Sequence, residues 1–189
     1  MRAFLNRLRR RLVRALSHRI VFGEAGRPHT RIAPSTCIEG EAGLELGDHV
    51  FIGQYNVIDA TAGLAIEEGV QITSFVSITT HSSHHALRVM GRAYAGAGAD
   101  MPAYLRAPIR IGAWSFIGPH SLIEPGAKIG RGCIVSAYAQ VRGEVPDFAI
   151  VAGQPARVVG DARARDAALL AAHPELAAHY EERFGKAEP

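Results

Sequence analysis

Aliphatic residues recur at every sixth position along most of this chain, and this period constrains the fold more than any other feature. A first group forms three short series, and a second group forms one unbroken series after a gap. The positions are Ile32 and Ile38; Leu46, Ile52 and Ile58; Ile66, Ile72 and Ile78; then Ile111, Ile117, Ile123, Ile129, Val135 and Val141. Two-residue slips before Leu46 and Ile66 indicate insertions at turns.

A six-residue period fits neither an α-helix, with its period of 3.6, nor an isolated strand, with its period of 2. It fits a chain that makes a short strand and a corner every six residues, with one aliphatic side chain pointing inward from each face. Three faces close one coil, and stacked coils pair their strands in parallel around a continuous core. The period therefore predicts an all-β solenoid over residues 30–160, whose handedness the pattern does not give.

The repeat breaks once, between Ile78 and Ile111. The gap of 33 residues is not a multiple of six, so residues 79–110 are expected to loop out of the solenoid. This segment contains "YAGAGADMPAYLRAP", which is rich in Gly and Ala. Long loops without a repeat are commonly functional.

The basic charge of the chain is concentrated at its N-terminus. Residues 1–20 contain seven arginines and no acidic residue, so the net charge of +3 leaves the other 169 residues at −4. A helical wheel over residues 1–22 separates the arginines from an apolar side formed by Phe4, Leu5, Leu8, Leu12 and Leu16. Such a helix suits an anionic membrane surface, or it packs on its own domain or a neighbouring subunit. Nucleic-acid binding is disfavoured because no basic patch continues into the rest of the chain.

Other features bear on the compartment and on the C-terminus. No apolar run approaches the roughly 18 residues of a membrane span, and the N-terminus lacks the apolar core of a signal peptide. Cys37 and Cys133 are expected to be buried, reduced thiols rather than a disulfide, which favours the cytoplasm. Residues 161–189 are expected to be helical, with Asp161 as a cap, Pro174 in the first turn of a second helix and Gly185 as a stop.

Three of the nine histidines lie within five positions, in "ITTHSSHHALR" at residues 78–88. A cluster of this kind can be a set of metal ligands, a general base with neighbours, or a polar loop without chemistry. His81 lies where the chain is expected to leave the solenoid, next to the interruption of the repeat.

The ordered motifs of the chain resemble those of the hexapeptide-repeat acyltransferases, in particular the maltose and galactoside acetyltransferase branch with its polysaccharide O-acetyltransferase relatives. The resemblance covers about residues 46–160. Its motifs are "THSSHHALR" at 80–88, "APIRIG" at 107–112, "SFIG" at 115–118, "IEPGAKIG" at 123–130, "VSAYAQV" at 135–141 and "VAGQPARVV" at 151–159. The resemblance implies a left-handed parallel β-helix with three hexapeptide repeats per coil, assembled as a homotrimer.

The resemblance also implies acyl transfer from acetyl-CoA to an acceptor hydroxyl or amine, with His81 as the general base. A histidine suits this role because its pKa lies near neutrality. Asn56 and Asp59 match a region that holds a sugar hydroxyl or steers the histidine, and a structural Asn ladder competes for Asn56. His84 and His85 are candidates for acceptor binding or have no role. The chain departs from the family's Gly-His-Pro at Thr80, His81 and Ser82, which puts the acceptor in doubt.

The coenzyme side of the resemblance falls on the later coils. The pantetheine arm is expected to follow Ser136, Ala137, Tyr138 and Ala139 in a groove between subunits. Three further side chains are candidates for coenzyme binding: Arg142, Arg157 and Trp114. Arginine suits the nucleotide phosphates because its fork of donors matches phosphate geometry. The family's Trp in "VWIG" is Phe116 here, and Trp114 lies two residues earlier.

Two other classes of protein compete with this interpretation. A γ-carbonic-anhydrase-like zinc solenoid would use His81 and His120, but the expected paired histidine is replaced by Pro125. The other is a solenoid that acts only as a scaffold. The preferred interpretation needs no metal and takes a sugar or glycan hydroxyl as acceptor; serine, an antibiotic or an amino sugar are the alternatives. We expect a cytoplasmic enzyme, with the N-terminal helix suited to the inner face of the membrane.

Overall fold

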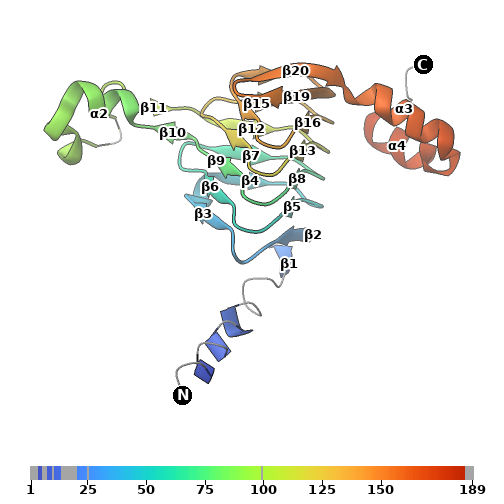
Figure 1. The fold of residues 1–189 in the computed structure, drawn as a ribbon, viewed down its shortest axis with the longest axis horizontal. Helices are drawn as coiled ribbons and strands as arrows, with labels where there is room; N and C mark the ends of the chain where they lie inside the picture. The colour runs from blue at the N-terminus through green and yellow to red at the C-terminus, as the bar shows by residue number, and fades with distance from the viewer. Residues whose placement is uncertain are drawn as a thin grey trace.

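The body of the protein is a stack of short strands that wind repeatedly through three sheets (Figure 1). Successive strands along the chain visit sheet A, sheet B and sheet C in turn, and the strands between adjacent coils pair in parallel. The chain therefore forms a parallel β-helix. This computed structural model describes residues 4–5, 8–9, 11–13, 21–24, 26–98 and 100–185.

Each sheet collects every third strand. Sheet A has the spatial order β1 (Val21–Glu24), β2 (Arg27–Ile32), β5 (Phe51–Ile52), β8 (Gln71–Ile72), β13 (Phe116–Ile117), β16 (Ile134–Val135), β19 (Ala149–Gly153) and β20 (Ala156–Asp161). Sheet B has β3 (Cys37–Glu39), β6 (Val57–Asp59), β9 (Ser77–Ile78), β14 (Leu122–Ile123) and β17 (Gln140–Val141). Sheet C has β4 (Leu44–Leu46), β7 (Leu64–Ile66), β12 (Ile109–Ile111), β15 (Lys128–Ile129) and β18 (Glu144–Val145).

The six-residue aliphatic series forms the core inside the three sheets. Ile52 pairs with Ile72 in sheet A, and Ile117 pairs with Val135 in the same sheet two coils later. All four side chains are fully buried. Burial of an Ile or Val side chain stabilises a fold by about 1.5–3 kcal/mol, so each coil contributes through its three inward residues.

Three columns of corners join the sheets, and each is named here by the sheets it connects. The AB corner comprises residues 33–36, 53–56, 73–76, 118–121 and 136–139. The BC corner comprises residues 40–43, 60–63, 79–80, 124–127 and 142–143. The CA corner comprises residues 47–50, 67–70, 112–115, 130–133 and 146–148.

The BC corner is longer in the early coils. Leu46 pairs with Ile66, 20 positions apart, whereas Ile111 pairs with Ile129, 18 positions apart. The extra residues form the 3-10 helix η1 (Glu41–Gly43) in one coil and the turn at Thr61 in the next. The turn insertions predicted from the two slips are confirmed.

Two segments project from opposite sides of the stack (Figure 1). One is the excursion between β9 and β12, which contains β10 (His81–Ser82), α2 (His84–Met90), η2 (Gly91–Gly96) and β11 (Leu105–Arg106). The other is the C-terminal segment, which contains α3 (Ala162–Ala172), η3 (Pro174–Leu176) and α4 (Ala177–Phe184).

The cap predicted for α3 is present, because the Asp161 side chain accepts a hydrogen bond from the Arg163 amide. Pro174 begins the 3-10 turn that precedes α4, not α4 itself.

Two further predictions concern the ends and the cysteines. A helix was predicted over residues 1–22. Residues 4–5, 8–9 and 11–13 are helical and exposed, and the other residues before β1 lie outside the described residues. Both cysteines are free thiols, and Cys133 is buried as expected. Cys37 is exposed, which corrects the prediction, because its side chain points outward from β3 while Ile38 points inward.

Candidate active site

His81 begins the excursion at the BC corner, where the chain leaves the stack. Its strand β10 pairs antiparallel with β11, so that His81 lies opposite Arg106. The His81 side chain is 34% exposed. The hairpin fixes the backbone of this residue, while the imidazole keeps one edge accessible to a small molecule.

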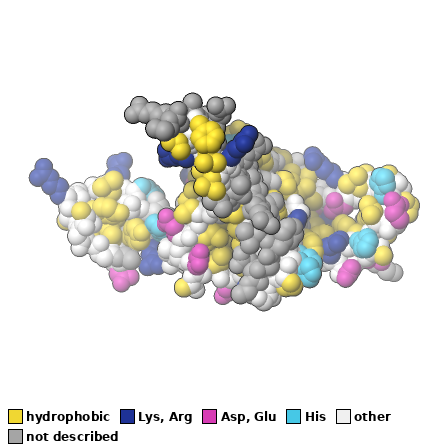
Figure 2. Space-filling model, turned by 90° about the horizontal axis from the view of Figure 1, so that it is seen from below, with side chains coloured by type: hydrophobic (Ala, Val, Ile, Leu, Met, Phe, Trp, Pro, Cys, Tyr) yellow, Lys and Arg dark blue, Asp and Glu magenta, His cyan; other side chains and the backbone are white. Residues whose placement is uncertain are grey.

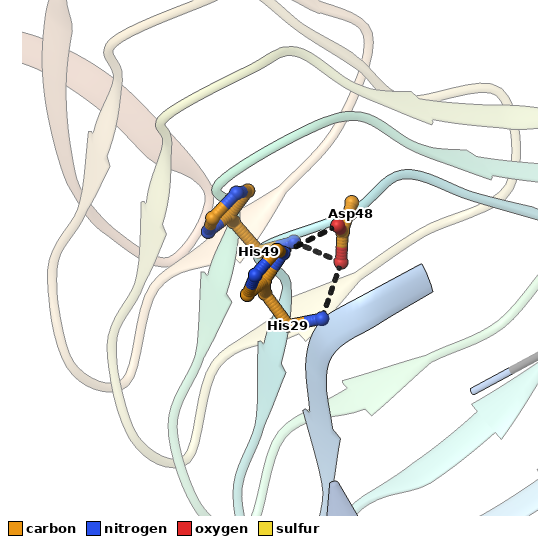
Figure 3. Close-up of side chains that lie close together, drawn as sticks. All are labelled: His29, Asp48 and His49. Atoms are coloured by element: carbon orange, nitrogen blue, oxygen red, sulfur yellow. Dashed lines mark hydrogen bonds and ion pairs between the residues drawn. The ribbon is translucent and has the colours of Figure 1, made fainter. Parts of the chain in front are cut away.

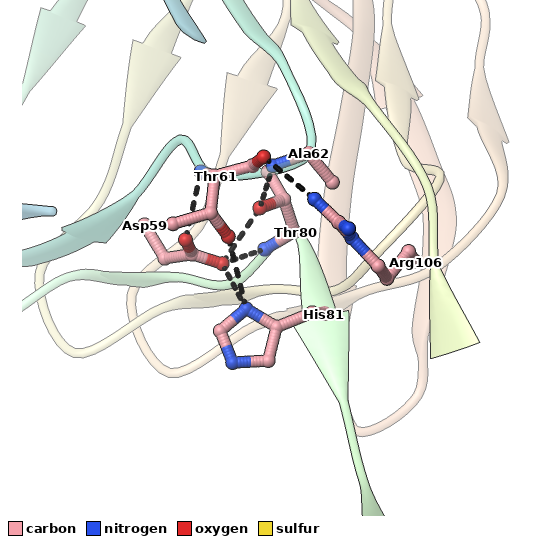
Figure 4. Close-up of polar contacts among 6 residues, drawn as sticks. All are labelled: Asp59, Thr61, Ala62, Thr80, His81 and Arg106. Atoms are coloured by element: carbon pink, nitrogen blue, oxygen red, sulfur yellow. Dashed lines mark hydrogen bonds and ion pairs between the residues drawn. The ribbon is translucent and has the colours of Figure 1, made fainter. Parts of the chain in front are cut away.

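The imidazole of His81 contacts the carboxylate of Asp59 (Figure 4). The Nδ1 atom of His81 lies 2.7 Å from Oδ2 of Asp59, the last residue of β6. An ionised carboxylate only accepts hydrogen bonds, so Nδ1 carries the proton in this pair. The Nε2 atom is therefore left with a lone pair that can accept a proton from a bound molecule.

Asp59 is held in its ionised form by several donors. Its Oδ2 atom accepts from the backbone amide and the hydroxyl of Thr80, at 2.8 and 2.6 Å, and its Oδ1 atom accepts from the amide of Thr61 at 2.9 Å. The side chain is only 6% exposed. Burial raises the pKa of Asp59, but the hydrogen bonds from Thr61 and Thr80 outweigh it and hold the pKa well below its ordinary value.

The two threonines also tie the corner together. The hydroxyl of Thr80 accepts from the amide of Ala62 at 3.1 Å, and the hydroxyl of Thr61 lies 3.3 Å from Nδ1 of His81. Thr80 is fully buried. At the position where the resembling family has Gly, this chain thus uses the Thr80 side chain to orient the carboxylate. No role was predicted from the sequence for Thr61, Thr80, Tyr104 or Arg106.

Asn56 lies at the AB corner and makes no contact with His81 or Asp59 among the contacts found in the described residues. Its amide nitrogen donates to the carbonyls of Gly53 and Thr73, and its oxygen accepts from the Val76 amide. The side chain is buried, at 1% exposed. These contacts favour the structural ladder over acceptor binding. Ser115 makes the same kind of backbone bridge at the CA corner.

His84 and His85 lie beyond His81 at the start of α2. Both are exposed, and their ring centroids are 4.0 Å apart. His84 contacts the hydroxyl of Ser82 at 2.6 Å. No described contact joins either ring to His81. The ring of Tyr104 does lie beside His81, with its centroid 5.6 Å from that of the imidazole.

The candidate coenzyme residues are divided between different corners. Ser136, Ala137 and Ala139 lie at the AB corner; Ala137 is exposed and Ala139 is buried, so only the backbone of Ala139 can reach a ligand. Tyr138 ends a column of stacked rings along this corner, with 4.8 Å between its centroid and that of His120. The AB corner and the BC corner with His81 are separated in one chain by the width of sheet B.

Trp114 and the two arginines lie apart from Ser136. Trp114 is at the CA corner, where the Arg183 guanidinium of α4 lies 4.6 Å from its ring centroid. Arg142 follows β17 at the BC corner and forms an ion pair of 2.6 Å with Glu124. Arg157 is exposed on β20, at the last coil.

A second cluster of possible metal ligands lies at the CA corner (Figure 3). It consists of His29, Asp48 and His49 and is the only such group among the described parts of the chain. The two rings are stacked, 4.4 Å apart and 6° from parallel, and Nδ1 of His29 lies 2.9 Å from Asp48. An ion lies in the plane of each imidazole that binds it, at about 2.0–2.1 Å for zinc, and one ion cannot lie in two parallel planes. In this geometry the cluster fits a stacking contact better than a metal centre.

The chain is similar in sequence to known acetyltransferases. It is 32% identical over 138 residues to a probable acetyltransferase of Mycobacterium tuberculosis, a match that covers 73% of this chain and 44% of that protein. The chain thus spans less than half the length of this relative. No family model matches the chain.

The fold is similar to that of solved acetyltransferase structures. A hexapeptide-repeat acetyltransferase from Vibrio cholerae has a TM-score of 0.63 and 27% identity, with 82% of this chain and 79% of that chain covered. A galactoside acetyltransferase in complex with coenzyme A has a TM-score of 0.60 and 25% identity, with 74% and 65% covered.

Proposed function

The chain is a relative of the hexapeptide-repeat acetyltransferases in both sequence and fold, and from this premise we propose that it transfers an acetyl group from acetyl-CoA to a hydroxyl group of a sugar or glycan. The observation that carries the proposal is the contact between His81 and Asp59 at the point where the excursion leaves the β-helix. A left-handed winding, as the resemblance implies, is part of the same proposal.

In the proposed reaction His81 is the general base. Its Nε2 atom takes the proton of the acceptor hydroxyl while the hydroxyl oxygen attacks the thioester carbonyl. When the carbon–sulfur bond breaks, the imidazolium returns this proton to the departing thiolate, so the products are an acetyl ester and free coenzyme A. Asp59 stabilises the imidazolium and keeps the proton of the resting imidazole on Nδ1.

A similar structure, the galactoside acetyltransferase with bound coenzyme A, supports the choice of a sugar acceptor. Galactosides offer hydroxyls and no amine. Serine, antibiotics and amino sugars remain the alternative acceptors. The zinc-solenoid alternative has less support, because the paired histidine expected shortly after His120 is absent and Pro125 stands at that position.

We further propose that the active site forms between copies of a homotrimer. The BC corner of one copy supplies His81, and the AB corner of a neighbour supplies the backbone of Ser136, Ala137 and Ala139 for the pantetheine arm. An exposed aromatic ridge marks this AB corner: Tyr55, Phe75 and Tyr138 are 43%, 51% and 60% exposed. Exposed apolar ridges of this kind suit subunit contact. Arg142 and Arg157 are the arginines proposed to bind the coenzyme phosphates. Arg157 suits this role better, because Arg142 already forms an ion pair with Glu124.

The N-terminal helix is proposed to lie on the inner face of the cytoplasmic membrane. Figure 2 shows apolar side chains of this segment flanked by basic ones. Phe4, Leu8 and Leu12 are 64%, 54% and 58% exposed, and anionic lipids attract arginines on such a helix. No helix among the described residues is long and apolar enough to cross a membrane. Deletion of residues 1–20 should abolish binding to anionic liposomes; binding that survives the deletion contradicts this part of the proposal.

The test of the catalytic proposal is a screen of acceptors with acetyl-CoA, monitored by the release of free thiol. Sugars, serine, amino sugars and aminoglycosides form separate arms. We expect release with at least one sugar, and a loss of about 10²–10⁴-fold in the His81→Ala variant. His173→Ala is the matched control, because it removes an exposed histidine from the C-terminal segment, outside both corners of the proposed site. Undiminished transfer by His81→Ala, or stoichiometric zinc together with carbonic anhydrase activity, contradicts the proposal.

A further inference from the structure

Arg106 lies beside the candidate base but has no part in the proposed proton transfer. It is the residue of β11 directly opposite His81 in the β10–β11 hairpin. Its Nη2 atom donates to the Thr61 carbonyl at 2.9 Å, while the hydroxyl of the same Thr61 lies 3.3 Å from the His81 ring (Figure 4). One residue therefore joins the guanidinium and the imidazole, and fixes the position of one relative to the other.

The charge of Arg106 is uncompensated among the described residues. Other arginines near the coils form ion pairs: Arg110 with Glu67 at 2.5 Å, Arg131 with Asp147 at 3.4 Å and Arg142 with Glu124 at 2.6 Å. No described carboxylate forms such a pair with Arg106, whose side chain is exposed. A guanidinium has five N–H donors in a planar fork, and the Thr61 carbonyl occupies one of them.

The surroundings of Arg106 favour an anion. Residues 79–108, which form the excursion, contain three arginines and one aspartate, whereas residues 21–189 as a whole have a net charge of −4. The nearby carboxylate of Asp59 is buried and already accepts from Thr80, Thr61 and His81. Tyr104, two residues before Arg106, adds an aromatic ring 5.6 Å from the imidazole. A local excess of positive charge raises the concentration of anionic ligands at such a site.

We propose that Arg106 binds an anionic group of the acceptor, so that the substrate is an acidic sugar with a carboxylate or a phosphate near the hydroxyl that is acetylated. The guanidinium fork suits both anions, because each presents two oxygens to two parallel N–H donors. His81 would take the proton of the hydroxyl, and Tyr104 would contact the sugar ring. This inference rests on the proposed function and specifies its acceptor.

The test compares matched sugars in the thiol-release assay, with the full-length protein and acetyl-CoA. Galactose, galacturonate and galactose 6-phosphate differ only in the group at the sixth carbon, and they separate the carboxylate from the phosphate. We expect kcat/KM for one of the two anionic sugars to exceed that for galactose by 10-fold or more. The ratio of kcat/KM for that anionic sugar to kcat/KM for galactose should fall by about 10–100-fold in Arg106→Gln, which is the effect of losing a charge-assisted hydrogen bond.

The matched control is Arg110→Gln, since Arg110 is paired with Glu67 and lies on sheet C, on the next strand. It should leave the ratio within about twofold of the wild type. Arg106→Lys keeps the charge without the fork and should give an intermediate ratio. A wild-type preference for galactose overturns the inference. So does an equal loss for all three sugars in Arg106→Gln, which would make Arg106 a residue that only positions Thr61.

A binding measurement separates failure of this inference from failure of the proposed function. Saturation-transfer NMR can detect galacturonate and galactose 6-phosphate on the protein without acetyl-CoA. Binding of an anionic sugar that is lost in Arg106→Gln and retained in Arg110→Gln supports the inference even if no thiol is released. Thiol release from neutral acceptors alone, with no binding of either anionic sugar, supports the proposed function and overturns the inference.

Discussion

The Nδ1 atom of His81 lies 2.7 Å from Oδ2 of Asp59, although the two residues are 22 positions apart and belong to successive coils. The β-helix produces this contact because β6 and β9 pair in parallel, which stacks the end of one coil on the end of the next. Asp59 ends β6, and His81 follows β9 by three residues. The two side chains are thus brought together by the repeat and by the excursion that interrupts it.

Replacement of Asp59 by Asn should impair catalysis more than binding. An Asn side chain offers its NH₂ group as well as its oxygen to Nδ1, so the imidazole can place its proton on Nε2 and lose its capacity as a base. We expect kcat to fall by about 10²–10⁴-fold with little change in KM for acetyl-CoA. Asp147→Asn, which alters an exposed carboxylate paired with Arg131, is the control and should retain activity. An Asp59→Asn enzyme with unchanged kcat contradicts the proposed role.

Asp59 should also make folding stability depend on pH in acid. Burial raises its folded pKa, but the hydrogen bonds from Thr61 and Thr80 outweigh burial and hold this pKa below the ordinary value. The stabilisation is therefore complete above the unfolded pKa, near 4, and is lost as the pH falls toward the folded pKa. At pH 7 Asp59→Asn should lower the free energy of unfolding by about 1–3 kcal/mol. Urea unfolding of the two proteins between pH 7 and pH 3 should show this difference shrinking; a constant difference contradicts the assignment.

Gly69 at the CA corner should not tolerate a side chain. Its φ of +70° lies in the left-handed region, and a Cβ atom there would lie 2.2 Å from the Trp114 ring. Gly69→Ala should lower the free energy of unfolding by about 1–3 kcal/mol or more, because the cost of backbone strain at residue 69 adds to the cost of displacing the Trp114 ring. Gly96→Ala, where a Cβ meets nothing within 4 Å, is the control in the same thermal unfolding experiment. Equal melting temperatures for the two variants would contradict the packing of Trp114.

The fold was predictable from the sequence because one physical rule, an inward aliphatic every six residues, operates along the stack except at the two slips and the excursion. Ile117 and Ile123 are buried at successive sheets as that rule requires. The site was predictable only in part. The resemblance directed attention to His81 and Asp59, which the structure brings into contact, and their roles in catalysis stay predictions.

The residues that the sequence analysis missed follow from the exceptions to the repeat. Thr61 is one of the extra residues at the slip before Ile66, and it contacts Asp59 and His81. Arg106 lies in the excursion, whose residues have no period to place them. The slip was visible in the sequence, but which side chains it brings to His81 depends on the stacking of corners. For the same reason Trp114, predicted with Ser136 to bind the coenzyme, lies at a different corner.

The proposed division of the site between copies predicts complementation between two inactive variants. His81→Ala removes the base at the BC corner, and Ala137→Trp places a bulky ring in the exposed AB corner proposed for the pantetheine arm. Each variant alone should be inactive with a melting temperature near that of the wild type. If neighbouring copies in a cyclic trimer share each site, trimers assembled from a 1:1 mixture should recover about one quarter of wild-type activity, since each site needs one intact corner from each variant. The two variants can be co-expressed so that mixed trimers assemble, and the thiol-release assay then measures the recovered fraction of wild-type activity. No recovery, with trimers verified by light scattering, would show that one copy supplies both corners of its own site.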